Sequence, residues 1–84
     1  MILPAFYKRN SELQQKIELE IEKVKVGQSK KNMVQLQTIL TELQKSNMQK
    51  NVILSYPRTI VDSWDYSDQL GMELLELAEL YGKI

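Results

Sequence analysis

The chain has 84 residues, of which 26% are charged, with equal numbers of acidic and basic side chains. A chain of this length forms one domain, here residues 1–84, and buries only about 60–65% of the surface that it exposes when unfolded. It contains no cysteine and no histidine, which excludes disulfides, tetrahedral zinc sites and the catalytic triads that need those residues. We therefore expect a protein that is not an enzyme and that uses no cofactor and no metal.

The first nine residues place apolar side chains ahead of two positive charges. This apolar stretch is too short for the core of a signal peptide or for a membrane span. The lack of cysteine fits a reducing compartment. We therefore expect a cytoplasmic protein without a membrane partner.

Residues 11–26 are predicted to form the first helix. Ser11 and Gln14 have the spacing of a capping box, which marks a helix start. Apolar residues then recur every three or four positions, on one helical face: Leu13, Ile17, Ile21 and Val24. Gly27 is predicted to end the helix, because glycine takes the left-handed cap conformation without a steric penalty. Pro4, at a position suited to a first turn, leaves an earlier start open.

Residues 30–49 are predicted to form the second helix, with Ser29 as its N-cap. The short polar linker makes the two helices antiparallel neighbours, a helical hairpin. Alternate steps of three and four residues, typical of a coiled coil, connect a row that we call the seam: Met33, Leu36, Leu40, Leu43 and Asn47. The seam is either a core face or an interface between copies whose register Asn47 fixes, and the two readings are compatible. Val34 and Ile39 lie off the seam, so this helix is expected to contact two partners at once.

Residues 52–64 are predicted to form an irregular aromatic crossover. A β-branched apolar run interrupted by Pro57 favours an extended segment followed by a short turn or helix. Tyr56 precedes the proline and is expected to be extended.

Residues 67–81 are predicted to form the last helix, capped by Asp65 or Ser67. Its expected core face consists of Leu70, Leu74, Leu77 and Tyr81. Its expected solvent face consists of Glu73, Glu76 and Glu79. The predicted fold is all-α: a helical hairpin plus a C-terminal helix, similar to a three-helix bundle, with the aromatic crossover between them.

The crossover region combines residue types that are enriched at binding hot spots. The predicted partner-binding residues are Tyr56, Arg58, Trp64 and Tyr66. The alternative is structural: Trp64 and its apolar neighbours fill the open end of the hairpin.

Four lysines surround the predicted hairpin turn: Lys23, Lys25, Lys30 and Lys31. They are the one candidate for contact with nucleic acid, but the sequence pI of about 6.2 makes that contact unlikely compared with a solvated loop. Three aspartates spaced by three, Asp62, Asp65 and Asp68, lack the pattern of a calcium loop and favour helix capping.

The sequence favours a small protein-interaction module, a regulator, adaptor or inhibitor, that acts as a helical homo-oligomer, a dimer or larger. The alternatives are a nucleic-acid-associated regulator that uses the lysine-rich turn and a structural subunit of a larger assembly. Residues 1–50 hold nine Lys/Arg against five Asp/Glu, a net +4, whereas residues 51–84 hold two against six, a net −4. These halves are expected to attract each other within one fold or between copies.

Overall fold

The computed structural model describes residues 2–49, 51–65 and 67–83, and of residues 2 and 3 only the backbone. These residues form four helices and no strand: α1 (Ile2–Lys25), α2 (Met33–Met48), α3 (Tyr56–Ser63) and α4 (Gln69–Gly82). The prediction of an all-helical fold is therefore confirmed. None of these helices is long and apolar enough to cross a membrane.

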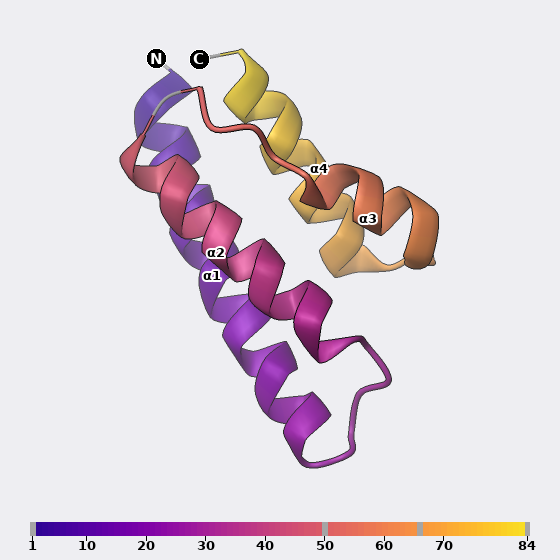
Figure 1. Cartoon of the computed structure of the whole chain (residues 1–84). Coiled ribbons are helices and arrows are strands. Elements are labelled where there is room, and N and C mark those ends of the chain that lie inside the picture. The colour runs from indigo at the N-terminus through magenta and orange to yellow at the C-terminus, as the bar shows by residue number, and fades with distance from the viewer. Residues whose placement is uncertain (1, 50, 66, 84) are drawn as a thin grey trace.

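The helices α1 and α2 run side by side in opposite directions, and their turn projects beyond α3 and α4 (Figure 1). Helix α1 packs on α2 and α4, and the short helix α3 also packs on α2 and α4. The predicted three-helix bundle is not confirmed in that form, because α3 takes part in the packing as a fourth helix.

The first helix begins at Ile2, so the start predicted at Ser11 is wrong and the earlier start that Pro4 left open is the one found. Ser11 lies inside α1, because the core face continues towards the N-terminus through Asn10 and Phe6, which are 0% and 1% exposed. Phe6 precedes Leu13 by two helical turns, so both side chains reach the same core.

Gly27 ends the first helix as predicted. Its φ of 78° lies in the left-handed region. Its backbone N–H donates to the Val24 carbonyl at 3.1 Å, and the Gln28 N–H donates to the Lys23 carbonyl at 2.7 Å. These two hydrogen bonds are those of a Schellman motif.

The N-cap of α2 is Asn32, so the assignment of Ser29 is wrong. The Asn32 side chain accepts from the Gln35 N–H at 3.1 Å. Ser29 instead donates to Glu20 at 2.7 Å, a bond between the turn and α1.

Of the turn or helix predicted for the second part of the crossover, the structure has the helix, α3, which follows the non-helical residues 52–55. Tyr56 is the first residue of this helix and is not extended as expected. Pro57 occupies the first turn, where its missing N–H would have had no intrahelical partner. Glu42 of α2 accepts from the backbone N–H groups of Ser55 and Tyr56 at 2.7 and 3.0 Å. A carboxylate from another helix therefore supplies the cap, which local sequence does not reveal.

The last helix begins one residue after Asp68, which caps it by accepting from the Gly71 N–H at 3.0 Å. The predicted caps Asp65 and Ser67 instead bond to each other, with the Ser67 N–H and hydroxyl donating to Asp65. The predicted core face of α4 is confirmed, since Leu74 and Leu77 are buried and Leu70 and Tyr81 pack against the core.

The core is formed by one buried set of ten side chains from all four helices: Phe6, Leu13, Ile17, Leu36, Ile39, Leu43, Tyr56, Ile60, Leu74 and Leu77. Two polar side chains are enclosed together beside it, Asn10 and Ser46: the Asn10 amide donates to the Leu43 carbonyl at 3.0 Å and to the Ser46 hydroxyl at 3.2 Å. Because an unmade bond would be costly here, Asn10 fixes how α1 and α2 align along their axes.

Gly71 lets α4 approach Trp64 and α3 closely. A Cβ atom at this position would lie 3.1 Å from Trp64 Cε3 and 3.3 Å from Ile60 Cγ2. At Gly82, in the same helix, a Cβ atom would meet nothing within 4 Å.

We expect Gly71→Ala to lower the free energy of unfolding by about 1–3 kcal/mol, because overpacking at this contact outweighs the better helix propensity of alanine. The matched control Gly82→Ala should leave stability unchanged or slightly higher. Thermal and urea denaturation, followed by Trp64 fluorescence, measure both. A Gly71→Ala variant as stable as the Gly82→Ala control would show that the contact is not restrictive.

Candidate functional site

The four residues predicted to bind a partner do not form one surface. Tyr56 is 1% exposed and its hydroxyl donates to the Leu74 carbonyl at 2.8 Å. Its burial raises the pKa of its hydroxyl, and nearby Glu42 adds to the rise. Tyr56 is thus a core residue and not part of an exposed surface.

Of the other three, Arg58 is exposed on α3 and lies 3.7 Å from the Asp62 carboxylate. Trp64 follows α3 and is half-buried. Its indole N–H donates to Gln35 of α2 at 3.2 Å. Tyr66 lies outside the described residues.

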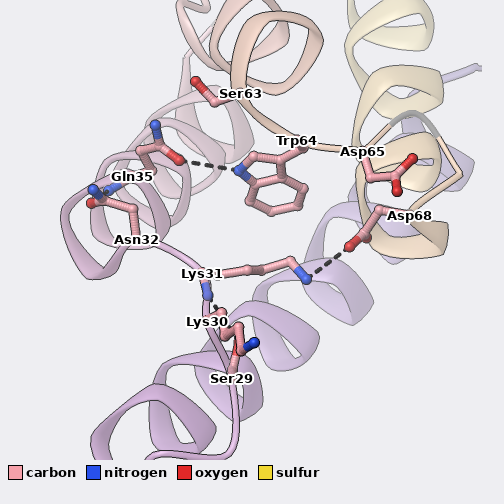
Figure 2. A pocket seen from close by; sticks show the side chains of 9 residues that line it. All are labelled: Ser29, Lys30, Lys31, Asn32, Gln35, Ser63, Trp64, Asp65 and Asp68. Carbon is pink, nitrogen blue, oxygen red and sulfur yellow. Dashed lines mark hydrogen bonds and ion pairs between the residues drawn. The ribbon is translucent and has the colours of Figure 1, made fainter.

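Trp64 lines an open hollow of about 400 Å³ between the α1–α2 turn, the start of α2 and the α3–α4 turn (Figure 2). The Lys31 ammonium group lies 5.1 Å from the centre of the indole ring, a cation–π contact. Most of the remaining lining is polar, with hydroxyl, amide and carboxylate groups from Ser63, Asn32 and Asp65. These residues lie in two separate parts of the sequence, and no motif groups them.

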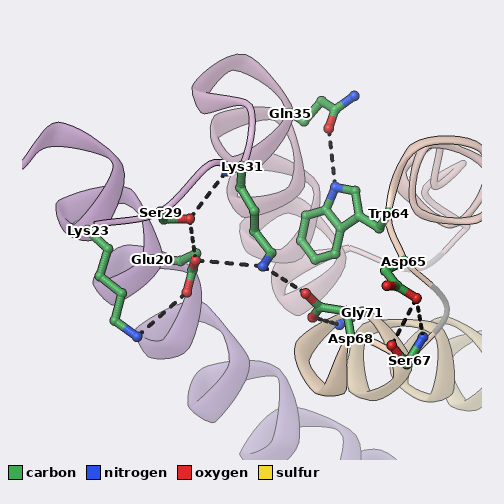
Figure 3. A network of polar contacts seen from close by, with 10 residues as sticks. All are labelled: Glu20, Lys23, Ser29, Lys31, Gln35, Trp64, Asp65, Ser67, Asp68 and Gly71. Carbon is green, nitrogen blue, oxygen red and sulfur yellow. Dashed lines mark hydrogen bonds and ion pairs between the residues drawn. The ribbon is translucent and has the colours of Figure 1, made fainter. Parts of the chain in front are cut away.

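The Lys31 ammonium group also forms two ion pairs, with Asp68 at 2.8 Å and with Glu20 at 3.7 Å (Figure 3). Burial by itself would raise the pKa of Asp68, but the hydrogen bond and charge of Lys31 and the Gly71 N–H outweigh it and hold that pKa below 3.8. In the same way, burial would lower the pKa of Lys31, but Asp68 and Glu20 raise it.

We call Glu20, Lys31, Trp64 and Asp68 the Lys31 junction. Its members come from α1, the hairpin turn, the end of α3 and the N-cap of α4, and Trp64 adds a bond to α2. Their polar groups bind one another or a helix terminus. The arrangement therefore connects the helices, since the charges of Glu20, Lys31 and Asp68 are paired with one another.

We expect the Asp68 carboxylate to make stability depend on acid pH. Because its pKa is lowered by folding, its contribution is present above the ordinary value and is lost as the pH falls through the folded value. Asp68→Asn keeps the N-cap but removes the charge. This variant should melt lower than the wild type near pH 7 and should lose less stability on acidification.

Asp68→Ala is the matched comparison, because it removes the cap as well and should cost about 1 kcal/mol more than Asp68→Asn. Thermal melts between pH 3 and pH 7 measure both effects. Identical pH profiles for the wild type and Asp68→Asn would contradict a role for the ion pair.

The prediction that Glu73 lies on the solvent face of α4 is wrong, because Glu73 is only 9% exposed. It pairs with Lys16 at 2.8 Å and with Arg9 at 3.4 Å, both on α1. The hydrogen bond from Lys16, opposed by burial and assisted by Gln69, lowers its pKa. These pairs, with Lys31 and Asp68, show that the two halves of the sequence attract each other within one fold.

The lysine-rich turn is partly neutralised. Lys23 lies 3.9 Å from Glu20, and Lys25 lies 3.4 Å from Glu22. Lys31 is held in the junction, and Lys30 is exposed. Because three of the four lysines have carboxylate partners, the turn offers phosphates less positive charge than the sequence suggests.

The seam divides into two parts. Leu36 and Leu43 are 0% exposed and belong to the core of the single chain. Met33, Leu40 and Asn47 are half-buried. The Asn47 side-chain oxygen is buried without a hydrogen-bond partner among the described residues.

The half-buried part of the seam faces away from α3. Gln35 and Glu42 point towards α3, since they bind Trp64 and the start of that helix. Met33 and Leu40 each lie two residues earlier, and two residues of an α-helix place side chains roughly 160° apart. Asn47 continues the row of Met33 and Leu40 by seven residues.

The same relation holds on α1. Arg9 and Lys16 point towards α4, where both bind Glu73. Tyr7 and Gln14 each lie two residues earlier, so they face away from α4. We call the two rows together the open face of the hairpin: Tyr7, Gln14 and Ile21 of α1, and Met33, Leu40 and Asn47 of α2.

Tyr7 is 42% exposed, and the other five residues of the open face are half-buried. The sequence predicted the α2 row as part of the seam but did not predict the α1 row. The repeat of seven residues through Tyr7, Gln14 and Ile21 is visible in the sequence, but its middle member is polar and does not stand out as part of a seam.

Comparison of the chain with protein-family models, with curated proteins and with solved structures finds no match.

Proposed function

We propose that this protein is a small helical protein-interaction module that binds a second copy of itself through the open face of its hairpin. The observation that carries the proposal is the open face itself. Two rows with heptad spacing lie side by side on antiparallel helices, and they remain half-buried on the side that α3 and α4 do not cover. Heptad rows of this kind pack against helices of a partner chain.

Asn47 supports a partner at this face, because its side-chain oxygen finds no donor among the described residues of its own chain. A buried acceptor without a donor costs about 1–3 kcal/mol. A polar side chain at a seam position is typical of helices that select one register and one oligomeric state at a cost in stability.

The charge around the open face also supports close approach of a second copy. Gln37 and Gln44 lie four residues after Met33 and Leu40, on the same side of α2, and both are exposed and uncharged. In a symmetric dimer these positions of α2 therefore bring no charge against the other copy, so no like-charge repulsion arises with the Glu18 carboxylate on the α1 flank of the face.

For a second, different partner we propose the outer side of α3. Arg58 is 91% exposed at its side chain and Val61 is 69% exposed. Arginine beside an exposed aliphatic group suits a protein interface. In this arrangement the module acts as a regulator, adaptor or inhibitor, and its absence of cysteine favours the cytoplasm as the place of action.

We expect the wild-type chain to be a dimer or larger in static light scattering on a sizing column, at both low and high salt, because none of the six residues of the open face carries a charge that salt could screen. The double variant Gln37→Glu/Gln44→Glu should be monomeric, since it places four new carboxylates in a symmetric dimer interface. Both positions are exposed, so the fold should be retained, as circular dichroism would show.

The matched control is Val34→Glu/Thr38→Glu, which adds the same charge at two exposed positions, each two residues from buried Leu36 and therefore on the opposite side of α2. This variant should have the mass of the wild type. A wild-type chain that stays monomeric up to millimolar concentration would refute the proposed self-association.

A further inference from the structure

We infer that the two copies are related by a two-fold axis parallel to the hairpin helices, so that Tyr7 of each copy lies beside Asn47 of the other. This inference rests on the proposed self-association and adds the orientation of the partner. It follows from how polar and apolar residues are distributed along the open face.

Helix α1 and helix α2 are aligned by Asn10, which binds the Leu43 carbonyl and the Ser46 hydroxyl. Because the helices are antiparallel, the residue one turn before Asn10 on α1 lies level with the residue one turn after Leu43 on α2. The open face therefore has three layers along its length: Tyr7 with Asn47, Gln14 with Leu40, and Ile21 with Met33.

The two end layers differ in chemistry. The layer at the turn is apolar, with Ile21 and Met33. The layer at the other end is polar, with the exposed phenol of Tyr7 and the Asn47 amide, whose oxygen has no donor within the described part of the chain. The two ends of the open face therefore differ, so reversing one copy end to end changes which layers meet.

Two symmetric ways exist to stack such faces. An axis parallel to the helices sets each layer against the same layer of the other copy, and α2 then lies beside α1 of the other copy. An axis perpendicular to the helices reverses the layers, and α2 then lies beside α2. Both keep neighbouring helices antiparallel, so the layers and not the helix dipoles decide between them.

The parallel axis satisfies the chemistry of both end layers. It brings apolar Ile21 and Met33 against their own kind, and it brings the Tyr7 hydroxyl of one copy to the level of Asn47 in the other. A change of rotamer that turns the Asn47 amide outward lets its oxygen accept from that hydroxyl. The perpendicular axis would instead cover Asn47 with Met33 and leave the oxygen without a donor.

Exposed flanking positions distinguish the two arrangements. Glu18 of α1 and Gln37 of α2 lie at one level of the hairpin and meet across the interface only with the parallel axis. Gln37 and Gln44 meet across the interface only with the perpendicular axis. The chain has no cysteine of its own, so single cysteines at these exposed sites report the arrangement without background.

The experiment mixes pairs of single-cysteine chains and oxidises them with oxidised glutathione. We expect Glu18→Cys with Gln37→Cys to give a covalent heterodimer, and Gln37→Cys with Gln44→Cys to give none. The reverse result would overturn the parallel axis while leaving self-association intact. A mass of one chain in light scattering for the unmodified protein would overturn the self-association and, with it, this inference.

A second readout tests the Tyr7 contact alone. Tyr7→Phe removes only a hydroxyl from a side chain that is 42% exposed, so the fold of the single chain should not change. Since symmetry gives two such bonds per dimer, the dissociation constant should rise roughly tenfold. An unchanged dissociation constant would overturn the pairing of Tyr7 with Asn47.

Discussion

Lys31 extends from the hairpin turn and places its ammonium group between Glu20 of α1 and Asp68 at the start of α4, beside the ring of Trp64. This cation links the hairpin, α3 and α4 beside the apolar core that they share. The indole ring beside it is also the one that α4 approaches closely at Gly71. Helix α4 contacts α1 through Glu73 as well as through the core. The placement of α3 and α4 therefore determines which side of the hairpin is covered.

The candidate interface is a consequence of that placement. Each helix of the hairpin packs on the other through one row of side chains and has a flank on either side of that row. Helices α3 and α4 cover one flank of each hairpin helix, and the open face lies on the other flank. Its residues are neither polar enough for a solvated surface nor enclosed enough for a core, which is typical of surfaces that pack against another helix pair.

The sequence predicted the helices well where periodicity and local signals agree, as at Gly27 and along the apolar face of α4. It failed where a partner distant in sequence decides. Ser11 has the local form of a cap, yet Phe6 packs in the core and carries the helix past it. Glu42 caps α3 from another helix. Glu73 has the spacing of a solvent-facing residue, and only the packing of α4 on α1 gives it two cationic partners.

The distance in sequence between α4 and its partners on the hairpin has a consequence for the order of folding. The hairpin closes over a short turn, whereas the bond between Lys16 and Glu73 joins residues 57 positions apart. Loop closure of that length costs more entropy and is slower. We therefore expect the hairpin to form before α4 packs against it. Until then both sides of the hairpin are uncovered, so at high protein concentration a second chain competes with α4 for the same helices. Correct folding then depends on which of the two binds the hairpin first.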